Sequence, residues 1–487
     1  MKLSFYGADQ CVTGSCHCLE VGGKHILIDC GLQQGRDEID NASLPFHPGQ
    51  IDYVLVTHAH IDHSGRIPML IKQGFQGRIL TTRLTADLLD IMLQDSAHIQ
   101  ESDAEYKNRK NQRAGRPMEE PLYTVEDAMR VREFMDTCEY GQQIHICDGV
   151  DAVFIDAGHL LGSASIRLTL TEGGETRTIV FSGDIGNVDQ PIIRNPQFFT
   201  GADYVVMEST YGDRNHTEVW SYTDELAQII DETLGRGGNV VIPAFAVGRT
   251  QELLYFIREI KDKNLVKSVK DFPVYVDSPL AKRATTIFCG DLRGYLDEEA
   301  LALVQDGTHM FNFTNLRMTE TSEESKMLNM DPTPKVIISA SAIPGNEVTV
   351  GRVINELFRK GADVVYDKAD MLHVSGHACQ EELKIIHALT KPKFFIPLHG
   401  EQRMLQIHKR VAEAVGMDPR NICVAENGSV IELTTKHIKC EASVPAGEVF
   451  VDGSGVGDVG AVVMRDRKRL AEDGMVVVAV SYTHLTL

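Results

Sequence analysis

Short apolar runs dominate the first half of the chain, and most of them end in glycine or in one polar residue. Such runs, bounded by turn residues, are typical of buried strands. They occur at residues 3–6, 16–21, 25–28, 51–56, 152–155, 178–181 and 203–207. Short strands joined by glycine-containing loops predict an α/β or β-rich sandwich and exclude a helical bundle.

The pattern of apolar residues changes after residue 210. Helical periodicity at residues 224–233, 249–261 and 278–288 alternates with short apolar runs at 239–243, 274–276 and 336–339. This alternation predicts a small parallel-sheet domain inserted into the first one. A strand at 363–366, a helix at 381–389 and a strand at 394–398 are expected after it. In the first half, the apolar stripe of residues 84–116 predicts one long helix.

The segment Thr57-His58-Ala59-His60-Ile61-Asp62-His63 directly follows the predicted strand 51–56. Imidazole nitrogens and carboxylate oxygens are ligands that suit zinc and similar divalent ions. His58 and His60, two residues apart, can point to one side of the turn, and Asp62 and His63 can face a second metal. A histidine-rich surface loop is the alternative, but four ligand types among residues 58–63 disfavour it.

Further ligand types follow other predicted strands. These are His159, Asp184, Glu208 and His399, together with a second histidine cluster at residues 373–377. Alone, His159 would more often be a structural histidine. Beside the turn at residues 57–63 it becomes a ligand candidate, because a two-metal site needs a further histidine and a bridging carboxylate.

Composition limits the function classes. The 487 residues are 43% hydrophobic, enough for two or three domains. No apolar stretch approaches the roughly 20 residues of a membrane span, and the N-terminus lacks the apolar core of a signal peptide. The ten cysteines are scattered without a CxxC pair. We therefore expect reduced thiols and a cytoplasmic location.

Charge gives a mixed indication. The net charge of −21 argues against nonspecific nucleic-acid binding by the whole surface. The run from Lys107 to Arg116 nevertheless holds five cations and no acid. It is either a solvated helix end or a contact for a phosphate backbone.

The ligand pattern is similar to the metallo-β-lactamase fold, a four-layered αββα sandwich with two metals at one edge. It is carried by His58-x-His60-x-Asp62-His63 with His159, Asp184 and His399 after strands. Asp29 matches the first motif of that fold, an acid that supports the metal loop from outside the ligand set. The long insertion resembles the β-CASP domain of the branch that acts on nucleic acids, with Glu208 at motif A, His377 at motif B and His399 at motif C.

The resemblance implies a domain order. Residues 1–205 would form the first part of the metallo-β-lactamase domain, 206–360 the inserted β-CASP domain and 361–435 the second part. Residues 436–487 would be a linker and a truncated C-terminal segment.

The two ends resemble different members of the branch. Residues 12–15, 207–212 and 277–281 are like the nuclease subunit of the polyadenylation-factor group. From residue 343 onward the text is similar to bacterial ribonuclease J, whose C-terminal domain helps it oligomerise. The last seven residues match nothing in the family, so we expect that domain to be missing, and a homodimer stays one of two alternatives.

The family also implies roles for the residues. His58, His60 and His159 would hold one zinc, and Asp62, His63 and His399 the other, with Asp184 bridging; manganese is the alternative metal. His377, oriented by Glu208, would protonate the leaving oxygen. His373, Ser375 and Gly376 would hold a neighbouring phosphate, unless Ser375-Gly376 merely forms a turn.

The predicted function is hydrolysis of RNA phosphodiester bonds by water activated at two metals. The expected substrate is single-stranded RNA, attacked from the 5′ end with some endonuclease capacity, in RNA processing and decay. Two alternatives stay open. One is a hydrolase of a small ester or thioester, which leaves Glu208, His377 and the insertion without a task. The other is a catalytically silent RNA-binding subunit, although such proteins typically lose ligands.

Overall fold

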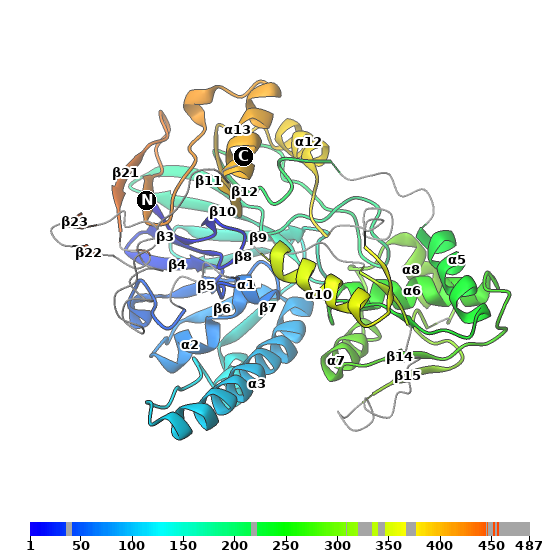
Figure 1. Cartoon of the computed structure of the whole chain (residues 1–487). Coiled ribbons are helices and arrows are strands. Elements are labelled where there is room, and N and C mark those ends of the chain that lie inside the picture. The colour runs from blue at the N-terminus through cyan, green and yellow to red at the C-terminus, as the bar shows by residue number, and fades with distance from the viewer. Residues whose placement is uncertain are drawn as a thin grey trace, which may run out of the picture. The chain divides into compact units, whose positions relative to one another are not determined.

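The computed structural model describes residues 1–35, 41–215, 222–307, 309–319, 334–338, 346–366, 376–444, 446, 451–452 and 455–456. The chain divides into two compact units, Met1–Ala446 and Gly447–Leu487. In the second unit, the described residues form the hairpin of β22 (Val451–Asp452) and β23 (Gly455–Val456). All that follows concerns the first unit (Figure 1).

The first sheet has eight strands in the order β21-β20-β1-β3-β4-β5-β6-β7. Its antiparallel part joins the N-terminal hairpin to strands from the far end of the unit, while β4, β5, β6 and β7 run parallel. The strands are β1 (Lys2–Gly7), β3 (Cys16–Val21), β4 (Lys24–Ile28), β5 (Tyr53–Leu55), β6 (Arg78–Thr82), β7 (Met135–Cys138), β20 (Ser429–Glu432) and β21 (Cys440–Ser443).

The second sheet has six strands in the order β18-β12-β11-β10-β9-β8. The strands are β8 (Gln143–Cys147), β9 (Val150–Asp156), β10 (Ala164–Glu172), β11 (Glu175–Phe181), β12 (Tyr204–Glu208) and β18 (Phe394–Leu398). The predicted domain boundary at 205/206 falls inside β12, whose five residues all pair with β18. The strand therefore lies in this sheet as far as Glu208; the other boundaries stay predictions.

The main core lies between the two sheets. Alternate residues of β1 and β9 point into it, among them Leu3, Phe5, Ala152 and Phe154, all fully buried. Period-two alternation places one face of each strand inward, and each large apolar side chain contributes roughly 1.5–3 kcal/mol on burial. This core holds together the edge at which the strand ends meet.

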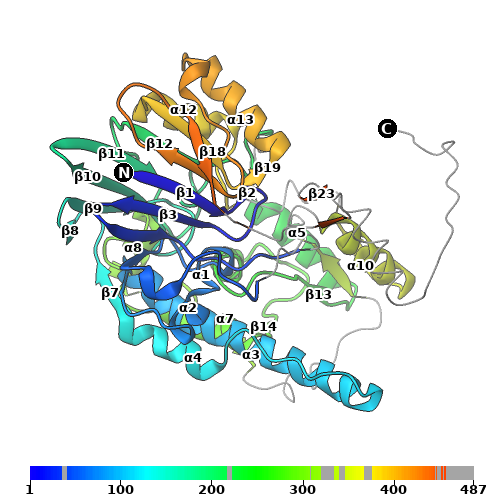
Figure 2. The ribbon, with the colours of Figure 1, turned by 90° about the vertical axis from the view of Figure 1, so that its left-hand side faces the viewer.

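Helices cover the outer face of each sheet, which gives the four layers visible from top to bottom in Figure 2. On the first sheet lie α1 (Ile61–Ser64), α2 (Ile67–Lys72), α3 (Arg83–Ala114) and α4 (Val125–Arg130). On the second lie α12 (Gln380–Thr390) and α13 (Gln402–Ala414). The predicted αββα sandwich is confirmed, and so is the long helix expected at residues 84–116.

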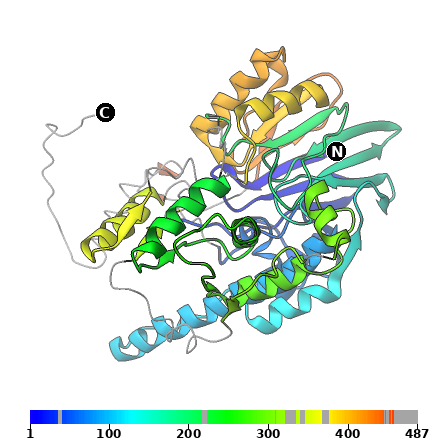
Figure 3. The same ribbon diagram turned by 90° about the vertical axis from the view of Figure 1, so that its right-hand side faces the viewer.

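An additional α/β part follows β12 in the chain, and Figure 3 shows its helices in green and yellow. Its parallel sheet has the order β13-β16-β17, with a parallel pair β14-β15 beside it. The strands are β13 (Val240–Val241), β14 (Val274–Val276), β15 (Leu316–Met318), β16 (Lys335–Ile337) and β17 (Asp363–Val365). The helices are α5 (Tyr222–Gly235), α6 (Arg249–Asp262), α7 (Pro279–Phe288), α8 (Glu298–Gln305) and α10 (Glu347–Arg359). The parallel sheet expected from the alternation is present.

Two further strands and three short helices complete the described elements of this unit. β2 (Asp9–Gln10) pairs with β19 (Gly400–Glu401). The single 3₁₀ turns are η1 (Pro48–Gln50), η2 (Val131–Phe134) and η3 (Pro419–Asn421). Every helix in the described part of the chain is too short or too polar to cross a lipid bilayer.

Candidate metal centre and catalytic site

Four strands of the second sheet end at the same edge. β9 and β11 are both antiparallel to β10, and β12 and β18 run parallel to β11. His159 and Asp184 lie three residues beyond β9 and β11, Glu208 is the last residue of β12, and His399 follows β18. The topology therefore gathers four ligand-type residues that are far apart in the sequence.

The loop at His58–His63 brings ligands from the first sheet to the same edge, because it follows β5. Its conformation is held from the neighbouring strand: the Cys30 amide donates to the His63 carbonyl at 2.8 Å. Gly31 lies so close that a Cβ atom there would stand 1.6 Å from the Asp62 carbonyl oxygen. Only glycine permits this approach.

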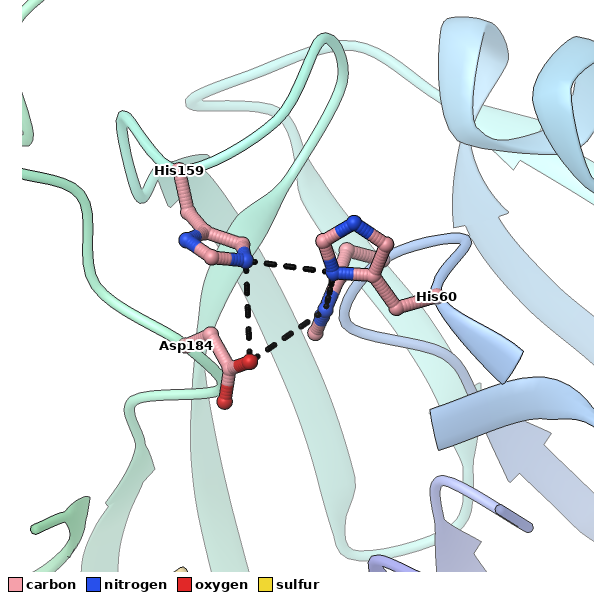
Figure 4. Close-up of side chains that lie close together, drawn as sticks. His60, His159 and Asp184 are labelled. Atoms are coloured by element: carbon pink, nitrogen blue, oxygen red, sulfur yellow. Dashed lines mark hydrogen bonds and ion pairs between the residues drawn. The ribbon is translucent and has the colours of Figure 1, made fainter. Parts of the chain in front are cut away.

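The first ligand group consists of His58, His60, His159 and Asp184. His60 Nδ1 lies 3.0 Å from His58 Nε2 and 3.2 Å from His159 Nε2. Asp184 Oδ2 lies 3.5 Å from His58 Nε2 and 3.6 Å from His159 Nε2. Figure 4 shows His60, His159 and Asp184 converging on one point.

The second ligand group consists of Asp62, His63 and His399. The Nε2 atoms of His63 and His399 are 3.1 Å apart, and Asp62 Oδ2 lies 3.6 Å from His399 Nε2. The other oxygen of Asp184, Oδ1, lies 3.2 Å from His63 Nε2. One carboxylate thus presents one oxygen to each group.

A third group joins Asp184 to Glu208 and His377. His377 Nδ1–H donates to Glu208 Oε2 at 2.8 Å, and Glu208 Oε1 accepts the Ile185 amide at 2.5 Å. Glu208 is fully buried, whereas 22% of the His377 side chain is exposed. A buried acid therefore orients an accessible imidazole beside the ligand groups.

Asp29 supports the metal loop. Its Oδ1 accepts the Thr57 amide at 2.8 Å, and its Oδ2 accepts the Thr57 hydroxyl at 2.9 Å and His63 Nδ1–H at 2.7 Å. Because the Thr57 hydroxyl donates to Asp29, it accepts from His58 Nδ1 at 3.0 Å. These bonds leave the Nε2 atoms of His58 and His63 directed to the ligand groups.

Two further acceptors fix the remaining histidines. His159 Nδ1–H donates to the Gly376 carbonyl, which leaves Nε2 for the first group. His399 Nδ1–H donates to the Thr210 hydroxyl at 3.1 Å, which leaves Nε2 for the second group. Such partners raise the basicity of a metal-ligating nitrogen and hold the ring in place.

The three histidines of the first group are neutral. Burial, with like charge on His63, holds the pKa of His58 well below its usual range, and burial also lowers the pKa of His60. Burial and the charge of His377 hold the pKa of His159 well below its usual range. Neutral imidazole is the form that binds a metal ion.

In the second group, charge interactions outweigh the effect of burial on the pKa values. Burial would lower the pKa of His63, but the Asp184 and Asp29 carboxylates raise it well above its usual range. Burial would raise the pKa of Asp62, but His63 and His399 lower it to about 2. A cation that binds here must displace a proton from His63.

His377 also carries a proton at neutral pH. Burial would lower its pKa, but the Glu208 carboxylate outweighs burial and raises the pKa of His377 to about 10. A protonated imidazole held by a buried acid is suited to donate a proton to a leaving group.

The donor set fits two divalent ions. The Nε2 atoms of His58 and His159 both face His60 Nδ1. His58 and His159 already donate through Nδ1, so in the neutral rings Nε2 carries no proton. The single proton that His60 Nδ1 can carry therefore forms a hydrogen bond with at most one of them. Asp184 Oδ1 is buried without a well-aligned hydrogen-bond donor, and His63 Nε2 lies 3.2 Å from it. A shared cation in each group would satisfy these lone pairs, and nitrogen with oxygen ligands suits zinc or manganese.

The structure brings together all seven predicted ligands and places Asp29, Glu208 and His377 against them. Of the predicted phosphate contacts, Gly376 offers its carbonyl to His159, while His373 and Ser375 lie outside the described residues. Sequence reasoning missed Thr57 and Thr210. The available signal was their position at strand ends, with Thr57 directly before His58 and Thr210 two residues after Glu208.

Three sequence families match consecutive parts of the chain. The Metallo-beta-lactamase superfamily matches residues 10–204 and the Beta-Casp domain residues 250–360. The Zn-dependent metallo-hydrolase RNA specificity domain matches residues 361–422.

Several curated relatives are named as ribonucleases. Ribonuclease TTHA0252 of Thermus thermophilus is 35% identical over 358 residues, which cover 73% of this chain and 75% of the relative. Ribonuclease J 1 of Streptococcus pyogenes is 26% identical over 94% of this chain and 79% of its own length. Endoribonuclease YSH1 of Eremothecium gossypii is 27% identical over 65% of this chain and 40% of its own length.

A solved protein of unknown function from Enterococcus faecalis has a similar fold. It superposes with a TM-score of 0.51 at 15% sequence identity, over 89% of this chain and 99% of that chain. At this identity the likeness concerns the fold alone.

Proposed function

The chain belongs to the β-CASP ribonucleases of the metallo-β-lactamase superfamily, and from this premise we propose how its residues divide the work of cleaving RNA. The family makes it a metal-dependent ribonuclease. This sets aside both the hydrolase of small esters and the silent RNA-binding subunit. The residue roles, the metal identity and the mode of cleavage are our proposal.

One observation carries the assignment: Asp184 offers one oxygen to each ligand group. We assign His58, His60 and His159 to one ion, and Asp62, His63 and His399 to the other, with Asp184 shared. Zinc is the metal we propose, because imidazole predominates among the ligands. Two such ions would supply charge neutralisation at the phosphate and would lower the pKa of a water molecule toward about 7.

The protein's own side chains orient the general acid and protonate the leaving group. Glu208 holds His377 through Nδ1, which directs Nε2 to the reaction site. His377 donates the Nε2 proton to the 3′-oxygen as the phosphorus–oxygen bond breaks, so that the leaving group departs as a neutral hydroxyl. A positioned general acid of this kind typically contributes 10²–10⁴-fold in rate.

Substrate position is assigned to the residues around motif B. We propose that His373, Ser375 and Gly376 hold the phosphate that neighbours the scissile bond. The Gly376 carbonyl bonds His159, which ties this segment to the first ligand group.

The mode of cleavage we propose is 5′-to-3′ exonuclease action on single-stranded RNA with some endonuclease capacity, in RNA processing and decay. Resemblance to ribonuclease J supports the exonuclease part, and the relative named Endoribonuclease YSH1 supports internal cuts. We place the activity in the cytoplasm. The structure describes nine of the ten cysteines, all except Cys440, as free thiols, as in a reducing compartment.

The test compares one RNA in two forms: linear with a 5′-monophosphate, and circular. We expect rapid digestion of the linear form and slow cutting of the circle. An untouched circle would overturn the endonuclease capacity, and equal rates on both forms would overturn the preference for 5′ ends.

A His377→Asn variant tests the general acid in the same assay. It should lose about 10²–10⁴-fold in cleavage rate on both RNA forms. The metal content, measured by mass spectrometry, should stay unchanged. Wild-type cleavage by this variant would remove His377 from the mechanism.

A further inference from the structure

The distal end of α3 carries a cluster of cations that the mechanism does not use. In residues 107–118 the sequence has five basic residues and no acidic one. They are Lys107, Arg109, Lys110, Arg113 and Arg116, and all of them are exposed. This cluster, with the exposed Tyr106, is called the α3 tip below.

The tip lies far from the candidate metal centre. α3 starts directly after β6, which runs parallel to β5 and so ends at the edge of the sheet where His58 lies. At 1.5 Å per residue its 32 residues span about 48 Å. Figures 1 and 2 both show its C-terminal end extending beyond the sandwich.

Five acidic residues flank the tip in the sequence, Glu101, Asp103, Glu105, Glu119 and Glu120, and one of them forms an ion pair with a tip cation. Glu119 pairs with Lys107 at 3.2 Å, and Glu101 accepts the Val125 amide at 3.2 Å. Throughout residues 41–215, a stretch described without a gap, no acidic side chain forms an ion pair with the other four cations of the tip. Within this stretch, four cations of the tip thus have no ion-pair partner, in a protein of net charge −21.

The C-terminal end of α3 has a defined structure and is not frayed. Gly115 ends the helix in the left-handed conformation at φ 66°, and the following segment folds back. The Asn108 side chain donates to the Glu119 carbonyl at 2.8 Å and accepts the Glu119 amide at 2.7 Å. These bonds hold the backbone that carries the cations.

The helix dipole does not explain the whole cluster. Cations favour a helix C-terminus, but the effect fades beyond the last turn. Lys107 and Lys110 lie before that turn. Tyr106 is 56% exposed, with Lys110 Nζ 4.2 Å from the centre of its ring. An exposed aromatic ring among cations is the arrangement by which proteins hold a single-stranded nucleic acid, through phosphate contacts and base stacking.

We propose that the α3 tip is a second RNA-binding surface, which holds the body of a long single-stranded substrate while its end or cleavage point occupies the metal centre. The inference rests on RNA being the substrate. The cations of the tip would bind RNA phosphates, and one base would stack on Tyr106. Affinity must then depend on RNA length, because a short RNA in the metal centre cannot reach the tip.

The experiment measures RNA binding by fluorescence anisotropy in the His377→Asn background, which limits cleavage. It uses RNAs of about 5 and about 30 nucleotides, one near the lower limit of typical single-strand site sizes and one well above the upper limit. The test variant is Arg109→Ala/Lys110→Ala/Arg113→Ala. The matched control, Lys2→Ala/Lys436→Ala/Lys439→Ala, removes three exposed cations elsewhere.

For the long RNA we expect the test variant to bind at least about ten-fold more weakly and the slope of log affinity against log salt to fall by about 2, since each lost phosphate contact removes about 0.7. The short RNA and the control should show no change. Tyr106→Ala should weaken long-RNA binding by about ten-fold, and Tyr106→Phe should not, because stacking needs only the ring.

Several results would overturn the proposal. One is unchanged binding of the long RNA by the test variant, and another is an equal loss of affinity for both RNA lengths. A third is a loss of affinity for an acidic polypeptide but not for RNA, which would identify the tip as a protein-docking surface. Cleavage of the short RNA is measured separately in the wild-type background. If the tip variant binds the long RNA normally while the wild type cleaves RNA, the tip proposal is wrong and the proposed function stands. If binding depends on RNA length as expected but the wild type does not cleave RNA, the tip proposal stands and the proposed function is wrong.

Discussion

At the scale of single residues, the metal centre depends on groups that touch no metal. Asp29 adopts φ 61°, a left-handed conformation that aspartate tolerates better than most residues. This backbone turn aims its carboxylate at Thr57 and His63 together. Asp29 therefore sets the orientation of His63 directly and of His58 through the Thr57 hydroxyl.

An Asp29→Asn variant should lose metal affinity. Its amide has one acceptor oxygen and a donating NH2 group, so it cannot accept all three bonds from Thr57 and His63, and the tautomer and orientation of His63 are no longer fixed. Loss of such a supporting partner typically costs 10–100-fold in metal affinity. Competition with a chromogenic chelator measures the change.

Asp151→Asn is the matched control. Asp151 also accepts from a histidine, His145 Nδ1, at 3.0 Å, but on an exposed strand. It should leave metal affinity unchanged. If both variants bound metal as the wild type does, the supporting role of Asp29 would be wrong.

Residue types carried most of the site prediction. Histidine and aspartate in a dense turn are rare without a metal, so His58, His60, Asp62 and His63 could be identified from spacing alone. Thr57 and Thr210 could not, because threonine is common at strand ends and its role depends on which ring nitrogen lies beside it. That information exists only in three dimensions.

At the scale of elements, local patterns predicted the strands that end in ligands and the long helix α3. They did not predict β10 or β20. β20 pairs with β1, and Lys2 lies opposite Glu432. Such pairing depends on contacts between distant residues, and sequence periodicity gives no indication of it.

The helices behind the second sheet are joined by a buried polar network that the sequence did not indicate. His387 on α12 and His408 on α13 share a hydrogen bond of 3.1 Å between their Nε2 atoms. His408 Nδ1 lies 2.9 Å from the Ser209 hydroxyl, next to Glu208. Both rings are buried among apolar side chains, so this network favours neutral histidines.

The network predicts acid sensitivity of this layer. Burial lowers the pKa of His387 from 6.5 to about 4. The unfolded chain takes up the proton first, so the stabilising contribution is complete above pH 6.5 and is lost as the pH falls toward 4. The loss amounts to about 3 kcal/mol at most.

Urea unfolding at pH 7.5 and pH 5 tests this prediction. His387→Gln keeps a hydrogen-bond donor for His408 but does not titrate, so it should reduce the difference in unfolding free energy between the two pH values. The exposed His98→Gln is the control and should leave that difference intact. An unchanged pH dependence in His387→Gln would assign the acid sensitivity elsewhere.

At the scale of the whole molecule, the metal centre joins parts that the chain keeps far apart. The loop after β5 comes from one sheet, and His159, Asp184 and His399 come from the ends of strands in the other. Ions bound there would connect both layers of the sandwich. Without them, neighbouring carboxylates and imidazoles must balance their charges alone.

Removal of metal should therefore destabilise the whole first unit, not the site alone. Ligand binding to the folded state stabilises by about 4 kcal/mol when the free ion is a thousand times its dissociation constant. Chelation should lower Tm and speed amide exchange at residues 57–63 and 182–186 together.

Readdition of zinc should restore both properties with release of protons, because binding displaces the proton that Asp184 and Asp29 keep on His63. Calorimetry in two buffers of different ionisation enthalpy counts those protons, and their number should decrease as the pH rises above the pKa of His63. Parallel titrations with manganese decide which ion gives the larger rise in Tm. A protein already stripped of metal is the control for direct effects of the chelator. An identical Tm with and without metal would mean that the sheets alone hold the strand ends in place.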